Sequence, residues 1–257
     1  IIPYTYFIIT KKIPKTINSR LILLFCLGGL QATIGWYMVK SGLIDRPDVS
    51  HYRLALHLSV ALVIYSLIFW LILETKQLNL SNYTININAQ VKNRIKLKKI
   101  SIFIICLICL QILYGVLMAG LKGGLGFNNW PKMGAEWLPI EIFNKSPFLL
   151  NFFEATYVLQ FIHRWLGMIV AVCCISFAIY LIKSNKILSK NHKPFTKLKS
   201  ASFALIGIVS LQFLLGVASL IMMVPTLIAS AHQMGAIVLL SVCLYITFIL
   251  KNEKINV

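Results

Sequence analysis

Three histidines carry the clearest chemical signal in this sequence. His57, His163 and His232 each lie near the same end of a long apolar run. A lone histidine at a membrane boundary is most often a satisfied polar residue, but three at matching depth favour a shared role, because ionisable groups inside membranes are usually functional. His163 and His232 come from different predicted helices, so they can supply the two axial ligands of one haem iron.

A second motif alternates with these histidines. Leu-Gln-x3-Gly occurs three times, with its glutamines at Gln31, Gln111 and Gln212 and its glycines at Gly35, Gly115 and Gly216. Glycine lets two helices approach closely, and a glutamine inside a membrane can hydrogen-bond a neighbouring helix. We therefore favour a structural role over a catalytic one for both residues.

Cationic residues accompany the histidines. Arg164 follows His163, while Arg46 and Arg53 flank His51. Arginine binds carboxylates through paired hydrogen bonds, so the three arginines are predicted cofactor-binding residues that face haem propionates. The alternative is that they anchor helix ends among lipid headgroups. His51 is predicted to lie in a loop, where it is placed to support a site.

Composition places these residues in a membrane. Of the 257 residues, 58% are hydrophobic and only 12% are charged, and the mean hydropathy is +0.81. A soluble domain needs more polar surface than that. A spanning helix needs about 20 apolar residues, and six segments qualify: 21–43, 54–74, 100–121, 159–182, 202–224 and 231–250. The predicted fold class is all-α, a polytopic membrane helix bundle.

Charge predicts the orientation of the bundle. Four segments (11–20, 76–99, 183–199 and 251–257) hold 18 of the 25 Lys and Arg residues, and the alternate loops hold five of the seven Asp and Glu residues. Basic loops stay on the cytoplasmic side, so the C-terminus is predicted to be cytoplasmic and nucleic acid is not a partner. His192 lies in a Lys-rich loop and is predicted to be solvated. The loop 122–158 is predicted to fold over the outer mouth of the bundle.

The internal repeat predicts further helices before residue 1. Glutamine helices and histidine helices alternate, and the second half of the chain holds two of each, whereas the first half shows only Gln31 and His57. The spacing of the second half places the counterpart of His163 upstream of residue 1. We therefore predict two four-helix repeats with the first half incomplete. The predicted divisions are an N-terminal half at 1–99 and a C-terminal half at 100–257.

Four stretches of the chain resemble the heme A synthase family of the proteobacterial and mitochondrial type. They are SGLIDRPDVSHYRLALHL (41–58), AGLKGGLGFNNWPKMGAEWLP (119–139), FIHRWLG (161–167) and AHQMGA (231–236). The resemblance covers nearly the whole chain, and the first two stretches are the specific ones. It implies an eight-helix inner-membrane oxidoreductase, bacterial or mitochondrial. The reaction implied is oxidation of the C8 methyl of heme O, through an alcohol and a gem-diol, to the formyl group of heme A.

The resemblance also implies roles for the histidines. A b-type haem would be held by His163 and His232 in the C-terminal half, and heme O, the substrate, would bind in the N-terminal half with His57 as one ligand. The family's second substrate-site histidine and its catalytic glutamate have no counterpart in this sequence, so the catalytic residue is unknown. A truncated sequence and a degenerate, inactive remnant are the two explanations.

The implied partners are membrane lipid and heme O. A contact with the enzyme that produces heme O and a homo-oligomer stay open, and the electron donor and acceptor are unknown.

Two other functions stay open on the residues alone. A b-type cytochrome that only transfers electrons would need the same pair of histidines. A transporter built from repeats would line its path with the glutamines. The predicted helices lack the Gly and Pro interruptions that usually mark such a path, so the transporter ranks third.

Overall fold

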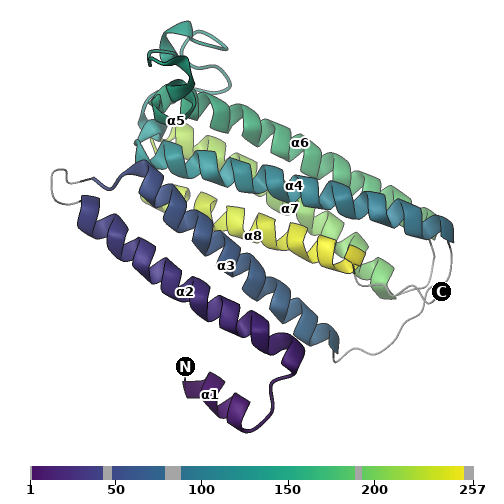
Figure 1. Ribbon diagram of the computed structural model, residues 1–257. Helices are drawn as coiled ribbons and strands as arrows, with labels where there is room; N and C mark the ends of the chain where they lie inside the picture. Colours follow the sequence, from purple (N-terminus) through teal and green to yellow (C-terminus); the bar gives the residue numbers. More distant parts are fainter. Residues whose placement is uncertain (1, 43–47, 79–87, 189–192, 252–257) are drawn as a thin grey trace. The chain divides into compact units, whose positions relative to one another are not determined.

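The computed structural model describes residues 2–42, 48–78, 88–188 and 193–251. These residues form helices and loops, with one isolated β-bridge between Met133 and Glu136. The α-helices of the described residues are α1 (Ile2–Ile9), α2 (Lys15–Gly42), α3 (His51–Leu78), α4 (Asn88–Gly120), α5 (Asn151–Glu154), α6 (Thr156–Leu188), α7 (Lys193–Ile221) and α8 (Thr226–Lys251) (Figure 1). The all-α prediction is confirmed.

Six of these helices are long and apolar enough to cross a membrane: α2, α3, α4, α6, α7 and α8. Each predicted apolar segment corresponds to one of them, although 202–224 runs past the end of α7 at Ile221, and the predicted polytopic bundle is confirmed. The helices begin earlier than predicted, because hydropathy marks the apolar middle of a helix and misses a polar first turn. His51, predicted in a loop, is instead the first residue of α3, where the Leu54 amide donates to the Ser50 carbonyl oxygen at 3.0 Å.

The chain divides into two compact units, residues 1–69 and residues 70–257. In the first unit α1 lies against α2, because the Tyr4 hydroxyl donates to Oδ1 of Asn18 at 2.8 Å and the Tyr4 and Phe25 rings lie 4.9 Å apart. The boundary between the units falls within α3. The predicted division into halves at residues 99 and 100 stays a prediction.

The second unit is built around a ring of four helices. Contacts join α4 to α6, α6 to α7, α7 to α8 and α8 back to α4. Fully buried aliphatic side chains fill the ring, among them Ile108, Leu159, Leu205 and Leu240. A hydrogen bond of 2.6 Å joins the hydroxyls of Ser101 and Thr247 in this core, so α4 and α8 are tied by a polar contact as well as by packing.

Large apolar side chains also cover the outer faces of these helices. Val172, Leu214 and Phe103 are exposed to 65%, 63% and 59%. Such a continuous apolar surface is unfavourable in water and suits contact with lipid tails. The buried and exposed faces are therefore both apolar, as a membrane bundle requires.

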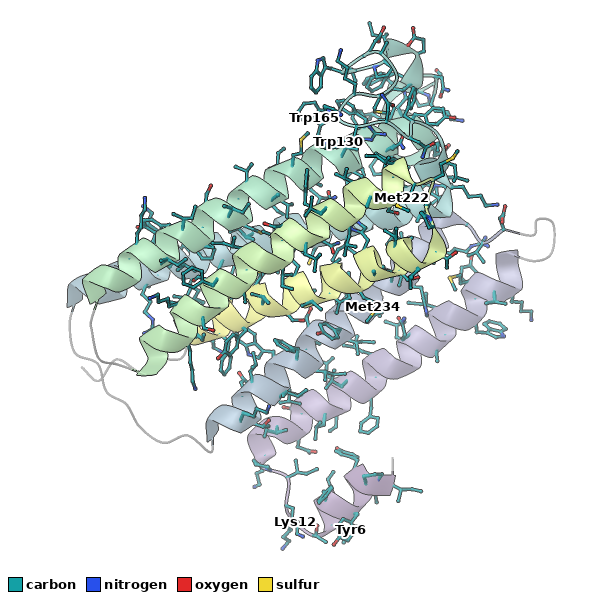
Figure 2. The ribbon with its side chains drawn as sticks, turned by 180° about the vertical axis from the view of Figure 1, so that it is seen from behind. Tyr6, Lys12, Trp130, Trp165, Met222 and Met234 are labelled. Atoms are coloured by element: carbon teal, nitrogen blue, oxygen red, sulfur yellow. The ribbon has the colours of Figure 1, made fainter. Side chains whose placement is uncertain are left out.

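A long loop lies over the ends of α6 and α7. It carries three short 3-10 helices, η1 (Gly123–Leu125), η2 (Ile140–Ile142) and η3 (Phe148–Leu150), and ends in α5. The Asn128 amide donates to the carbonyl oxygen of Leu220 at the end of α7, at 2.9 Å. The centre of the Trp130 ring lies 5.6 Å from that of Phe213. Figure 2 labels Trp130. The prediction that this loop folds over the end of the bundle is therefore confirmed for α6 and α7.

Candidate functional site

His57 lies on α3 and faces a glutamine of α2. The side-chain nitrogen of Gln31 lies 3.1 Å from the backbone oxygen of His57 and 3.2 Å from its ring Nε2. A Cβ added to Gly35, one turn after Gln31, would lie 3.0 Å from Cε1 of His57. The imidazole thus occupies the space that the missing side chain of Gly35 leaves open.

His163 on α6 has the same surroundings in the second unit. The side-chain nitrogen of Gln111 on α4 lies 3.0 Å from the backbone oxygen of His163 and 3.3 Å from its Nε2. A Cβ on Gly115 would lie 2.8 Å from Cε1 of His163. The arrangement around His57 is therefore repeated here almost atom for atom.

His232 on α8 keeps the arrangement with one change. The side-chain nitrogen of Gln212 on α7 again donates to the histidine's backbone oxygen, at 2.8 Å, but the ring contact comes from the backbone: Nδ1 of His232 lies 3.0 Å from the carbonyl oxygen of Gln212. A Cβ on Gly216 would lie 2.8 Å from Cε1 of His232. Each Gln-x3-Gly motif thus contacts the histidine of the next spanning helix, and the structural role of the motif stays a prediction.

His163 and His232 lie next to each other inside the second unit. Their ring centroids are 6.4 Å apart and their planes are nearly perpendicular, at 86°. Two imidazoles on opposite faces of one iron would have ring centroids roughly 6 Å apart, since each metal–nitrogen bond is about 2 Å long. The pair therefore fits the two axial positions of a haem.

The chemistry of the donor set also favours a porphyrin over a bare metal ion. Among the residues that the structure describes, no group of three or more His, Cys, Asp or Glu side chains gathers to hold an ion. Two imidazoles suffice where a macrocycle supplies the other four ligands.

The predicted arginines differ in their surroundings. Arg53 lies on α3 with its guanidinium 5.1 Å from the centre of the Tyr37 ring, a cation–π contact within the first unit. Arg46, like His192, lies outside the described residues. Arg164 is buried, and its guanidinium donates to the backbone oxygens of Asn129 at 2.9 Å, of Lys132 at 3.0 Å, and of Phe127.

Arg164 therefore joins α6 to the overlying loop. Its remaining nitrogen, Nε, is buried without a partner among the described residues, so its N–H is a donor that a propionate could use. Gln160, one turn earlier on α6, reinforces the same attachment. Its side-chain oxygen accepts from the Phe127 amide at 3.4 Å and its nitrogen donates to the Phe127 carbonyl at 3.1 Å. Gln160 was not among the predicted site residues, although a glutamine inside the apolar run 159–182 and three residues before His163 is a signal that the sequence contains.

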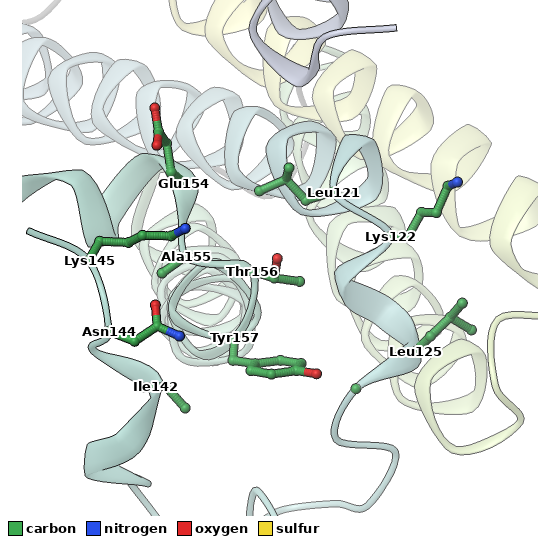
Figure 3. A pocket seen from close by; sticks show the side chains of 11 residues that line it. Leu121, Lys122, Leu125, Ile142, Asn144, Lys145, Glu154, Ala155, Thr156 and Tyr157 are labelled. Carbon is green, nitrogen blue, oxygen red and sulfur yellow. The ribbon is translucent and has the colours of Figure 1, made fainter. Parts of the chain in front are cut away.

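A cavity of about 370 Å³ opens between this loop and the start of α6. Lys122, Lys145, Glu154 and Tyr157 bring polar groups to its wall (Figure 3). None of the three candidate histidines lines it. The cavity is therefore separate from the histidine pair, and sequence analysis gave no indication of it.

Known proteins resemble the chain along nearly its whole length. The family COX15-CtaA, described as cytochrome oxidase assembly protein, matches residues 1–244. A heme A synthase of Orientia tsutsugamushi (strain Ikeda) is 39% identical over 267 residues, which cover 99% of this chain and 71% of the relative. Heme A synthases of Wolbachia pipientis subsp. Culex pipiens (strain wPip) and Nitrosospira multiformis are 37% and 33% identical, covering 98% of this chain and 70% and 67% of the relatives. No solved structure matches the chain.

Proposed function

This chain belongs to the COX15-CtaA family of cytochrome oxidase assembly proteins, and we propose that it is a heme A synthase. In this proposal the protein is an oxidoreductase that converts the C8 methyl group of heme O into the formyl group of heme A. The observation that carries it is the pair His163 and His232, 6.4 Å apart, in a chain whose relatives of that name share 33–39% of its residues.

The second unit would hold a b-type haem between His163 and His232. A haem bound there supplies one-electron redox chemistry. The chain's own residues hold the two rings in place: Gln111 and Gln212 fasten the histidine backbones to the neighbouring helices. The aliphatic core shields the buried faces from water. Arg164 keeps the overlying loop closed over the outer end of α6.

The N-terminal half, 1–99, would take heme O, with His57 as one ligand and Arg46 and Arg53 toward the propionates. The C-terminal half, 100–257, would be the b-type haem half. Support for this division comes from the repeat, because Gln31, Gly35 and His57 have the same mutual contacts as Gln111, Gly115 and His163. The catalytic residue is not assigned within the chain.

The proposed location is the inner membrane of a bacterium, with the Lys-rich loops and the C-terminus in the cytoplasm. The alternation of basic and acidic loops supports this orientation. Lipid and heme O are the proposed partners. Contact with the enzyme that makes heme O, and self-association, fit the same location.

The test is heme A production by the protein, expressed together with a heme O-producing enzyme in a host that makes no heme A. Haems are extracted and separated by chromatography. We expect heme A from the unmutated protein and His192→Ala, and a loss of at least about 100-fold in His57→Ala, as expected when a positioned reactive group is removed.

Heme A at the unmutated level in His57→Ala would contradict the substrate-site assignment. An unmutated protein that binds haem but yields no heme A would contradict the synthase proposal and favour the b-type cytochrome.

A further inference from the structure

The three glutamines of the repeat have an unexplained feature in common. In each, the side-chain nitrogen is engaged with the facing histidine, while the side-chain oxygen is buried without a hydrogen-bond partner among the described residues: Gln31, Gln111 and Gln212. A buried amide oxygen without a partner is unfavourable. Because all three glutamines leave this oxygen without a partner, the shared feature of the motif is the position of the amide nitrogen beside the histidine.

The contacts of this nitrogen determine which ring nitrogen of the histidine carries the proton. An amide nitrogen only donates, and it has two N–H groups. In Gln111 one of them points to the backbone oxygen of His163, an obligatory acceptor, at 3.0 Å, and the other meets Nε2 of the ring at 3.3 Å. Nε2 must therefore accept, and the ring proton must lie on Nδ1.

The reverse orientation of the amide is excluded by the same backbone oxygen. Exchanging the oxygen and nitrogen of Gln111 would place two acceptors about 3 Å apart, which is repulsive. Gln31 and His57 repeat the geometry, at 3.1 Å to the backbone oxygen and 3.2 Å to Nε2. The same argument therefore assigns the Nδ1–H form to His57.

His232 reaches the same form by a different route. Its Nδ1 lies 3.0 Å from the backbone oxygen of Gln212, and a carbonyl oxygen only accepts, so Nδ1 must carry the proton. All three histidines thus have an unprotonated Nε2. This is the nitrogen that a metal can use, because a ring nitrogen binds iron only through a free lone pair.

We infer that Gln31 and Gln111 are positioning residues, which hold His57 and His163 with the proton on Nδ1 and so reserve Nε2 for porphyrin iron. The identity of the metal in this inference rests on the proposed function. The assignment of the tautomer does not, because it follows from the hydrogen bonds alone. Hydrogen bonds that fix the tautomer of a ligand histidine usually come from the ring nitrogen away from the metal. Here the glutamine N–H occupies the lone pair of the ligand nitrogen itself, keeps that nitrogen unprotonated, and would give up this hydrogen bond when iron binds.

Gln212 provides a control for the effect of losing a hydrogen bond between two helices. Gln111 and Gln212 both donate to a histidine backbone oxygen, at 3.0 and 2.8 Å. Only Gln111 also contacts the ring through its side chain, whereas the ring of His232 is held by the backbone of Gln212. Gln111→Leu and Gln212→Leu therefore remove the same helix–helix bond, but only the first also removes a side-chain contact with the histidine ring.

The experiment is nitrogen NMR of the haem-free protein, ¹⁵N-labelled at histidine and reconstituted in lipid bilayers, with signals assigned by His→Asn variants. We expect His57, His163 and His232 as Nδ1–H tautomers in the unmutated protein. Gln111→Leu should convert His163 to a mixture of tautomers, and Gln212→Leu should leave His232 unchanged. Circular dichroism and thermal unfolding verify that each variant folds.

Two results would overturn the inference: an Nε2–H form of His163 in the unmutated protein, or an unchanged Nδ1–H form in Gln111→Leu. If Gln111→Leu does not fold, Gln31→Leu poses the same question for His57. Haem content is measured separately on the loaded protein. If haem is lost in His163→Ala but the tautomer of His163 is the same with and without Gln111, the inference alone is refuted. If the tautomer depends on the glutamine but the protein never binds haem, the proposed function alone is refuted.

Discussion

Each candidate ligand histidine occupies space that a glycine leaves open. The Cε1 atom of His232 would lie 2.8 Å from a Cβ added to Gly216, and the corresponding distances are 2.8 Å for His163 with Gly115 and 3.0 Å for His57 with Gly35. A close-packed interior does not absorb such an overlap without displacing atoms. The glycine therefore sets how near the ring can come to the neighbouring helix, and so where its nitrogen lies.

Gly216→Ala should accordingly displace the His232 ring. The added Cβ would lie 2.8 Å from Cε1, and relief of that overlap costs about 1–3 kcal/mol of stability. Gly207→Ala on the same helix is the matched control, because nothing lies within 4 Å of its added Cβ. It should be neutral or stabilising by roughly 0.5–1 kcal/mol. Thermal unfolding and haem content of the two variants check the prediction, and equal behaviour would contradict it.

The sequence was a good guide to which residues belong to the site. It was a poorer guide to the contacts that each of these residues makes. The repeat identified Gln111, His163 and Gly115 as partners in a pattern, since helices of similar length place equivalent residues at equivalent depths. Arg164 shows the limit. Its position beside His163 predicted a propionate contact, which stays a prediction. The hydrogen bonds from its guanidinium to three loop carbonyls were not predicted, because the path of residues 127–132 has no periodicity that could be recognised in the sequence.

At the level of elements, the loop after α4 depends on a small number of polar attachments to α6 and α7. Arg164 and Gln160 bind the backbone around Phe127, and Asn128 binds the end of α7. Hydrogen bonds from a charged donor contribute about 1.5–3 kcal/mol each. Arginine suits this role because its planar guanidinium presents several donors in fixed directions.

Arg164→Met should open this loop. The substitution keeps an apolar stem of similar length and removes the bonds to the carbonyls of Asn129 and Lys132. A loss of more than about 1.4 kcal/mol would raise the open population at least tenfold. Trypsin should therefore cleave after Lys132 at least about tenfold faster, as measured by mass spectrometry of the detergent-solubilised protein.

Arg94→Met is the control for this experiment. Arg94 also donates to a backbone oxygen, that of Ile249, at 3.1 Å, but from the start of α4 rather than near the loop. Cleavage after Lys132 should stay at the unmutated rate in this variant. An unchanged rate in Arg164→Met would show that the loop is held by its other contacts alone.

The helices themselves were predictable because their cause is local. A run of about 20 apolar residues has to form a helix in lipid, where each backbone polar group needs an internal partner. Their ends were less predictable, as His51 shows by opening α3. For the loop 122–158, the sequence predicted only that it folds over the end of the bundle. Its 3-10 helices were not predicted, since they depend on contacts with α6 and α7 rather than on the composition of the loop.

The whole second unit serves to bring two helices together at one depth. The ring of α4, α6, α7 and α8 places a histidine of α6 beside one of α8, and each is supported by a glutamine helix that precedes it in the chain. Residues far apart in the sequence meet because consecutive helices in a membrane bundle run antiparallel. The repeated sequence motif thus supports both candidate ligand histidines of this unit in a similar way.

The central claim is that His163 and His232 hold one haem between them. The most direct measurement is the reduced-minus-oxidised spectrum, with a pyridine haemochrome assay of haem content, of the purified protein beside His163→Ala and His232→Ala. We predict one b-type haem in the second unit, lost in both variants and retained in His192→Ala. Retention of that haem in either His163→Ala or His232→Ala would contradict the claim.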